Sequence, residues 1–283
     1  MILLFHLFVN SFIIFLYITR VLTFNSLKSI IKKNASKRRF EMKILFIGNS
    51  FSQNATRYIR EISNGELYVR NLYIGGCSLE THAKNIENDR PAYEYQVDGK
   101  AIAMTSIKSA LLCEEWDIVS VQQVSSLSGV YDSYFPYIDT VLAEVKKYRP
   151  NARIVFHRTW AYNYGSQHPG YANYNNDTDL MNEMIEKTAA KIAEKYSFDI
   201  IPTGVAVYKG LNTPEFDIRA GGVPLTAPDM FHLSSTYGEY LAGLVLYRFF
   251  TGNSATRVTF VPDGFDPKLV KILVEIADET EIG

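Results

Sequence analysis

Three residues in two short stretches have the types and spacing needed for nucleophilic catalysis. Ser50 follows the apolar run Ile44–Ile47, and Asp229 and His232 stand about 180 residues later, before a helical pattern. A serine hydroxyl is a weak nucleophile until a neighbouring base takes its proton, and an imidazole can be that base. A carboxylate on the other ring nitrogen fixes the imidazole tautomer. The three residues therefore predict acyl transfer by a serine, unless Asp229 and His232 only cap the helix that follows.

The surroundings of Ser50 place it where a strand ends and a helix begins. The apolar run indicates a strand buried on both faces, Gly48-Asn49 breaks it, and a helical pattern covers about 53–62. Open α/β sheets bind ligands at this end of their strands. The P-loop, dinucleotide-binding and G-x-S-x-G patterns are absent. A helix-capping serine is the alternative.

The segments Gly48-Asn49-Ser50-Phe51-Ser52 and Asp229-Met230-Phe231-His232 together resemble the first and last blocks of the SGNH (GDSL-like) hydrolase superfamily. The resemblance covers about 42–252. It implies one α/β domain, a three-layer α/β/α sandwich with a mostly parallel, roughly five-stranded sheet. It also implies a serine esterase that works through an acyl-enzyme and needs no metal or organic cofactor.

The resemblance further implies an oxyanion hole. In this superfamily the N–H of the nucleophile, here Ser50, is joined by that of a glycine after the second strand, for which Gly76 is favoured over its neighbour. The usual third block, Gly-x-Asn-Asp, is missing, which points to a bacterial branch with a substitute donor. Gln123 and then Gln122 are the candidates, because they end the third predicted strand and a side-chain amide is a suitable donor. A turn glycine and ordinary strand-end glutamines are the alternatives.

An aromatic segment at 160–176, called here the aromatic loop, follows the fourth predicted strand. It contains one tryptophan, four tyrosines and several amides. Such residues suit sugar rings, although they also suit packing within the loop or a protein contact. Trp160, His157 and Tyr162 are therefore candidate substrate contacts. They favour removal of small acyl groups, acetyl first, from a carbohydrate. A lipase or thioesterase on the same scaffold, or a catalytically silent glycan-binding module, is the alternative.

Composition excludes several other classes of protein. The chain has 283 residues, a net charge of −1 and 47% hydrophobic residues, so it is globular and lacks the basic excess of a nucleic-acid-binding protein. Cys77 and Cys113 allow at most one disulfide, and no Cys/His cluster has zinc-site spacing. The expected partner is a small-molecule or carbohydrate ester.

Residues 1–41 differ from the expected catalytic domain at 42–283. An apolar stretch at 2–19 precedes several basic residues, and Met42 stands directly before the first strand. The stretch is borderline in length for a membrane helix and lacks the leading positive charge of a secretory signal. A membrane anchor, a poor signal peptide and a misplaced translation start all stay open. The protein is cytoplasmic if translation starts at Met42, and otherwise anchored or exported.

The remaining patterns predict alternating strands and helices. Apolar runs indicate strands at 67–74, 116–121, 153–159 and 197–202. Periodic patterns and their caps indicate helices at 102–112, 134–148, 176–195, 203–209, 235–250 and 267–278.

Overall fold

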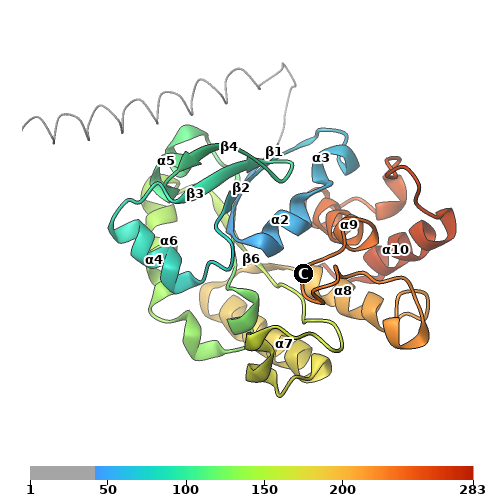
Figure 1. The fold of residues 1–283 in the computed structure, drawn as a ribbon. Coiled ribbons are helices and arrows are strands. Elements are labelled where there is room, and N and C mark those ends of the chain that lie inside the picture. Colours follow the sequence, from blue (N-terminus) through green and yellow to red (C-terminus); the bar gives the residue numbers. More distant parts are fainter. Residues whose placement is uncertain (1–41, 283) are drawn as a thin grey trace, which may run out of the picture.

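The computed structural model describes residues 42–282, so the hypotheses about the segment 1–41 lie outside the described residues. One seven-stranded sheet runs through the domain in the order β4-β3-β2-β1-β5-β6-β7 (Figure 1). Its strands are β1 Met42–Gly48, β2 Leu67–Tyr73, β3 Tyr93–Val97, β4 Lys100–Thr105, β5 Ile118–Val121, β6 Arg153–His157 and β7 Asp199–Ile201.

The sheet confirms the predicted α/β class and adds two strands. Strands β2, β1, β5, β6 and β7 are parallel neighbours, whereas β3 and β4 form an antiparallel hairpin at one edge. The helix predicted at 102–112 is wrong over its first part, which belongs to β4. The hairpin turns at Asp98 and Gly99, whose φ angles are 52° and 72°. Asp-Gly between two strands is a strong hairpin signal, and here it outweighs the helical pattern that begins at residue 102.

Helices cover both faces of the sheet, as a three-layer sandwich requires (Figure 1). Ile44 and Phe46 of β1 belong to a core cluster with α2, α3, α8, α9 and α10, while Leu45 and Ile47 belong to a cluster with α4, α5 and α6. This alternation follows from the two-residue period of a strand. The helices are α2 Ser50–Thr56, α3 Ile59–Ile62, α4 Leu79–Glu87, α5 Ile107–Cys113, α6 Tyr137–Tyr148, α7 Thr178–Tyr196, α8 Thr203–Leu211, α9 Tyr237–Thr251 and α10 Pro267–Glu279. Short 3-10 helices are Ser125–Leu127, Tyr131–Tyr134, Pro169–Tyr174, Ile218–Ala220 and Ala255–Arg257.

Helix α9 anchors the C-terminal part of the chain next to the start of α2. Most of its side chains are buried, and it packs against α2, α3, α8 and α10. The loop before α9 carries Asp229 and His232, so the packing of α9 brings these residues toward Ser50. Within 42–282, no helix combines the length and the apolar character that crossing a membrane requires.

The two cysteines are free thiols inside the core. Burial raises the pKa of Cys77 to about 12 and that of Cys113 to about 11. Both thiols therefore stay protonated near neutral pH, and neither has the thiolate character that a reactive cysteine needs.

Helix α8 begins in close contact with the end of β6 because residue 204 has no side chain. The Gly204 N–H donates to the Arg158 carbonyl oxygen at 2.9 Å. A Cβ atom at this position would lie 2.1 Å from the Thr159 carbonyl oxygen. The obstacle is backbone and cannot rotate away as the end of a side chain can.

We expect Gly204→Ala to lower the free energy of unfolding by about 1–3 kcal/mol, because the helix must move off the strand end. Gly75→Ala is the matched control, since its Cβ would meet only the end of the Tyr73 side chain, whose hydroxyl lies at 3.3 Å and can move away. Chemical denaturation measures both variants. Equal stability of the two would show that the contact at Gly204 relaxes without cost.

Candidate active site

The turn between β1 and α2 presents Ser50 as the first residue of the helix. Asn49 is the helix cap, since its side-chain oxygen accepts the Phe51 N–H at 3.0 Å. Ser52 completes the cap by accepting the Asn49 N–H at 3.1 Å. The helix thus begins three residues before the predicted start at 53 and breaks after Thr56. The cap is Asn49, so Ser50 is left for another role.

Ser50, His232 and Asp229 form one hydrogen-bonded chain. The His232 Nε2 atom lies 2.8 Å from the Ser50 Oγ atom, and His232 Nδ1 lies 2.7 Å from Asp229 Oδ2. Because an ionised carboxylate can only accept, Nδ1 carries the ring proton and Nε2 is left to accept from the serine. All three side chains are at least partly exposed. The arrangement can move a proton from the serine hydroxyl to the imidazole.

The other oxygen of Asp229 fixes the loop that carries the histidine. Asp229 Oδ1 accepts the backbone N–H groups of Phe231 at 3.1 Å and His232 at 3.0 Å. Burial by itself would raise the pKa of Asp229, but the hydrogen bond from the His232 ring and these two N–H groups together outweigh it and lower the pKa. Asp229 is therefore ionised at neutral pH, as an orienting partner for imidazole must be.

The backbone N–H groups of Ser50 and Gly76 have no hydrogen-bond acceptor among residues 42–282, and Gly76 directly precedes Cys77, whose carbonyl oxygen accepts from Asn49. Gly76 lies in the exposed turn after β2, at a φ angle of 62°, and a Cβ atom there would meet nothing within 4 Å. The positive φ favours glycine. Free N–H groups of this kind can donate to a developing oxyanion.

The two glutamines expected as a third oxyanion donor make other contacts. The Gln123 Nε2 donates to the Ser133 carbonyl oxygen at 3.1 Å, and its Oε1 accepts the Leu79 N–H at 2.9 Å. The Gln122 Nε2 donates to Asn49 Oδ1 at 2.9 Å. Each glutamine is 1% exposed. The structure therefore does not support the expected donor role, because both amides are buried and bonded to protein.

Gln122 instead belongs to a buried polar chain that the sequence did not reveal. Its Oε1 atom accepts from His157 Nδ1 at 2.8 Å, and His157 Nε2 lies 3.1 Å from the Thr203 hydroxyl. At the other end, the Asn49 amide nitrogen donates to the Cys77 carbonyl oxygen at 3.0 Å. Burial lowers the pKa of His157 to about 3, so this histidine is neutral and structural.

The aromatic loop packs inward. Trp160 and Tyr162 are each 0% exposed, and His157 is 1% exposed. Trp160 stacks on Phe51 with ring centroids 4.2 Å apart and donates its indole N–H to the Phe231 carbonyl oxygen at 2.9 Å. The structure therefore does not place these three residues where a substrate could touch them. Trp160 and Tyr162 pack against Phe51 and Phe231, the neighbours of Ser50 and His232 in two separate segments of the chain.

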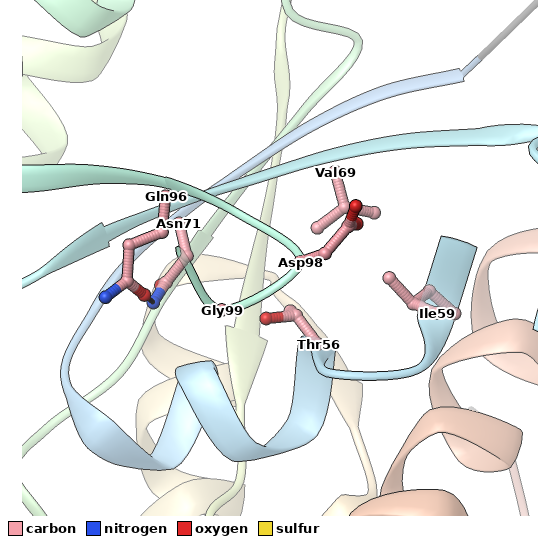
Figure 2. A pocket seen from close by; sticks show the side chains of 7 residues that line it. All are labelled: Thr56, Ile59, Val69, Asn71, Gln96, Asp98 and Gly99. Atoms are coloured by element: carbon pink, nitrogen blue, oxygen red, sulfur yellow. Dashed lines mark hydrogen bonds between the residues drawn. The ribbon is translucent and has the colours of Figure 1, made fainter. Parts of the chain in front are cut away.

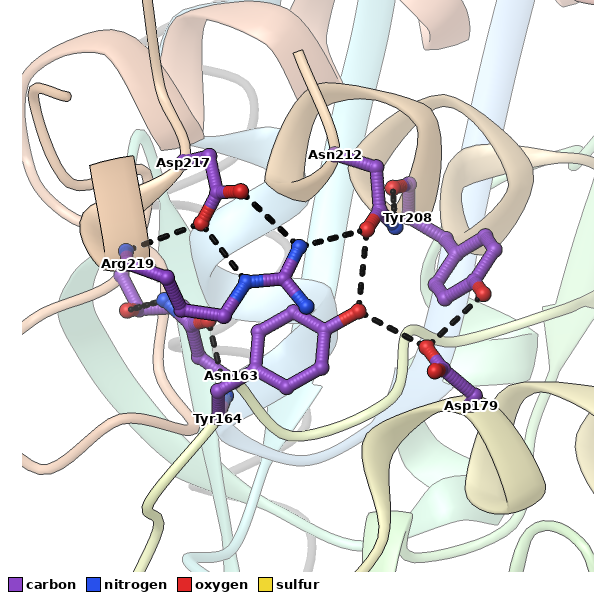
Figure 3. Close-up of polar contacts among 8 residues, drawn as sticks. Asn163, Tyr164, Asp179, Tyr208, Asn212, Asp217 and Arg219 are labelled. Atoms are coloured by element: carbon purple, nitrogen blue, oxygen red, sulfur yellow. Dashed lines mark hydrogen bonds and ion pairs between the residues drawn. The ribbon is translucent and has the colours of Figure 1, made fainter. Parts of the chain in front are cut away.

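A polar network on the surface fastens the aromatic loop to α7 and α8 (Figure 3). The Tyr164 hydroxyl donates to Asp179 at 2.7 Å and contacts Asn212 at 2.9 Å. The Arg219 guanidinium lies 3.6 Å from the centre of the Tyr164 ring and is held by Asp217. Each of these polar groups has a protein partner, so the network fixes the loop from its outer side.

A small hollow and the metal-ligating side chains bear on whether a second site exists in the described part of the chain. Figure 2 shows a small hollow at the far end of α2 from Ser50, lined by Thr56, Ile59, Val69, Asn71, Gln96, Asp98 and Gly99. Residues 42–282 contain no group of three or more His, Cys, Asp or Glu side chains placed to hold a metal ion.

Comparisons with known proteins show a family model and a similar solved structure that cover most of the chain. The sequence model described as "Domain of unknown function (DUF4886)" matches residues 43–279. A DUF4886 family protein from Bacteroides uniformis is 33% identical with a TM-score of 0.76, and the alignment covers 84% of this chain and 93% of that one. No curated protein sequence matches the chain.

A candidate SGNH hydrolase from Slackia heliotrinireducens is 22% identical with a TM-score of 0.53, over 73% of this chain and 97% of that one. At this identity the likeness shows the fold alone, an α/β fold like that of the Slackia protein, in agreement with the predicted fold class. The family match spans nearly all of the described residues. The chain belongs to the DUF4886 family.

Proposed function

We propose that the chain is a serine esterase that hydrolyses small carboxylic esters through an acyl-enzyme. The observation that carries the proposal is the hydrogen-bonded chain from Ser50 through His232 to Asp229, with contacts of 2.8 Å and 2.7 Å. It joins side chains 182 residues apart, at the end of a parallel strand. A triad is recognised by such geometry and by the roles of its members.

In the first half of the reaction, Ser50 Oγ attacks the ester carbonyl carbon while its proton passes to His232 Nε2. The carbonyl oxygen becomes an oxyanion, which the N–H groups of Ser50 and Gly76 are free to bind. The intermediate then breaks its bond to the alcohol oxygen, and His232 returns the proton to that oxygen. The alcohol leaves, and the acyl group stays on Ser50.

In the second half, water takes the place of the alcohol. His232 removes a proton from the water as it attacks the acyl carbon, and the proton then goes to Ser50 Oγ as the ester bond to the serine breaks. Asp229 stays ionised throughout and stabilises the imidazolium that forms at each stage. Acid is released, and the enzyme returns to its starting state.

Short acyl groups, acetyl first, are the substrate class we propose. The carbohydrate part of the hypothesis came from the aromatic loop, and the burial of Trp160 and Tyr162 removes that support. Acetylated sugars are therefore compared with simple acetate esters. A silent glycan-binding module would not need the Ser50–His232 contact, which makes it a poorer account of the site.

Replacing Ser50 or His232 by alanine is expected to abolish turnover. The full chain should hydrolyse p-nitrophenyl acetate, and Ser50→Ala and His232→Ala should each lower kcat by about 10³-fold or more, because each removes a member of one catalytic unit. Release of p-nitrophenol measures the rate, and acetylated xylose serves as the sugar substrate.

Ser235→Ala is the control for this experiment, since Ser235 is exposed in the same loop as His232. It should keep the wild-type rate. Turnover that survives loss of both Ser50 and His232, or a wild-type chain with no turnover of any ester, would overturn the proposal.

Asp229→Asn should lower kcat by about 10³–10⁴-fold with little loss of stability. The N–H groups of Phe231 and His232 hold Oδ1, so the new amide nitrogen must face His232 Nδ1. The ring nitrogen Nδ1 would then have to accept a hydrogen bond from the amide. The ring proton would move to Nε2, which could no longer remove the Ser50 proton. Steady-state kinetics beside thermal melting tests this, with the exposed Asp263→Asn as control. Near-normal kcat in Asp229→Asn would mean that the tautomer is fixed in another way.

A further inference from the structure

Glu239 is a buried acid that the proposed mechanism does not use. It lies in the first turn of α9 and is 7% exposed. Its Oε1 atom accepts from the Asn54 Nδ2 atom at 2.7 Å. Within the described residues, no lysine or arginine forms an ion pair with it.

Asn54 connects this acid to both halves of the candidate site. It lies one turn after Ser50 in α2, and its Oδ1 atom accepts the Leu233 backbone N–H at 3.1 Å. Leu233 directly follows His232. Because a backbone N–H can only donate, the Asn54 oxygen must face Leu233 and its nitrogen must face Glu239. The Leu233 N–H therefore determines which way the amide points, and Glu239 accepts from the amide nitrogen in that orientation.

An ionised carboxylate at position 239 is unfavourable because the side chain is buried. Burial raises the pKa of Glu239 to about 7, although the Asn54 hydrogen bond and the nearby Arg57 lower it. The pKa of Tyr58 is raised by burial and further by Glu239. Glutamine is nearly the same shape, accepts the same hydrogen bond and has no charge to bury. An ionisable side chain kept where a neutral one would fit better is typical of a functional position.

We propose that Glu239 and Asn54 are positioning residues for the reaction. They hold the backbone at Leu233, next to His232, against α2, which begins at Ser50. In this way they set the distance between His232 Nε2 and Ser50 Oγ. This inference rests on the proposed esterase function. The Tyr58 hydroxyl adds a second tie, since it donates to the Ser235 carbonyl oxygen at 2.7 Å, but only the Asn54 contact adjoins His232.

Glu239→Leu should lower kcat for p-nitrophenyl acetate by about 10–100-fold, because small misplacements of reacting groups are costly. KM should change by less than about threefold, since no substrate contact is lost. Glu239→Gln, which can still accept from Asn54, should keep kcat within about threefold of wild type at pH 7. Tyr240→Phe is the control, because it loses a partly buried hydrogen bond of the same helix, to the Phe260 carbonyl oxygen at 2.8 Å, yet should leave kcat unchanged.

A paired substitution tests the direction of the hydrogen bond. Asn54→Asp places two carboxyl groups face to face and should lower kcat by about tenfold or more. Adding Glu239→Gln supplies a donor to the new carboxylate, whose other oxygen still accepts from Leu233, so the double variant should recover most of the loss. A double variant no faster than Asn54→Asp, or Glu239→Leu at the wild-type kcat, would overturn the proposal.

Hydrogen exchange at the Leu233 amide separates this proposal from the esterase proposal. The amide should exchange about tenfold faster or more in Glu239→Leu than in wild type, because Asn54 is no longer held. If wild type turns over no ester, the esterase proposal fails, and exchange still shows whether Glu239 holds the loop. Unchanged exchange in Glu239→Leu overturns the positioning role whatever the activity.

The charge of Glu239 also predicts how stability depends on pH. The pKa of about 7 in the folded chain exceeds the ordinary 4.5, so the folded state binds the proton more tightly and stability falls as pH rises from about 4.5 through about 7. Glu239→Gln should therefore raise Tm over wild type by about 2–6 °C at pH 8 and hardly at pH 4. Thermal melts at both pH values measure this, and an equal shift at the two would mean that Glu239 does not titrate in this range.

Discussion

The orientation of one buried amide, that of Asn49, underlies the rest of the site. Its oxygen accepts a backbone N–H and its nitrogen donates to a backbone carbonyl, so the amide cannot turn over. That orientation dictates those of Gln122, His157 and Thr203 in sequence. This series of hydrogen-bonded side chains connects the ends of β1, β5 and β6 with the start of α8. Ser50, the next residue after Asn49, inherits a fixed position from a network that never touches substrate.

The histidine reaches the serine by a different route. No strand carries it; it lies in a loop stabilised by Asp229 and by the contact of Leu233 with Asn54. The serine is therefore fixed by the sheet and the histidine by the packing of α9 on α2. The candidate site lies where the start of α2 meets the loop before α9, and the polar contacts between these two segments determine its geometry.

Short sequence motifs and apolar runs predicted the fold and the candidate triad better than the chemistry of single side chains predicted their roles. Ser50 could be placed because it stands where a strand ends and a helix begins, a boundary that apolar periodicity locates well. Asp229 and His232 lie in the loop before α9, and only their resemblance to the last SGNH block pointed to them. The five parallel strands followed from apolar periodicity as well. Trp160 and Tyr162 were misinterpreted because aromatic residues suit a sugar face and a protein core equally, and only tertiary packing decides between them. Gln122 could not be assigned because the partners of a buried amide lie far away in sequence.

The placement of His232 has a consequence for biosynthesis. A nascent chain emerging from the ribosome displays Ser50 and most of the sheet well before the loop of His232 and helix α9 have left the exit tunnel. Until α9 docks on α2, the serine has no base beside it and is an ordinary hydroxyl. Completion of the C-terminal segment thus supplies the base that the candidate nucleophile needs.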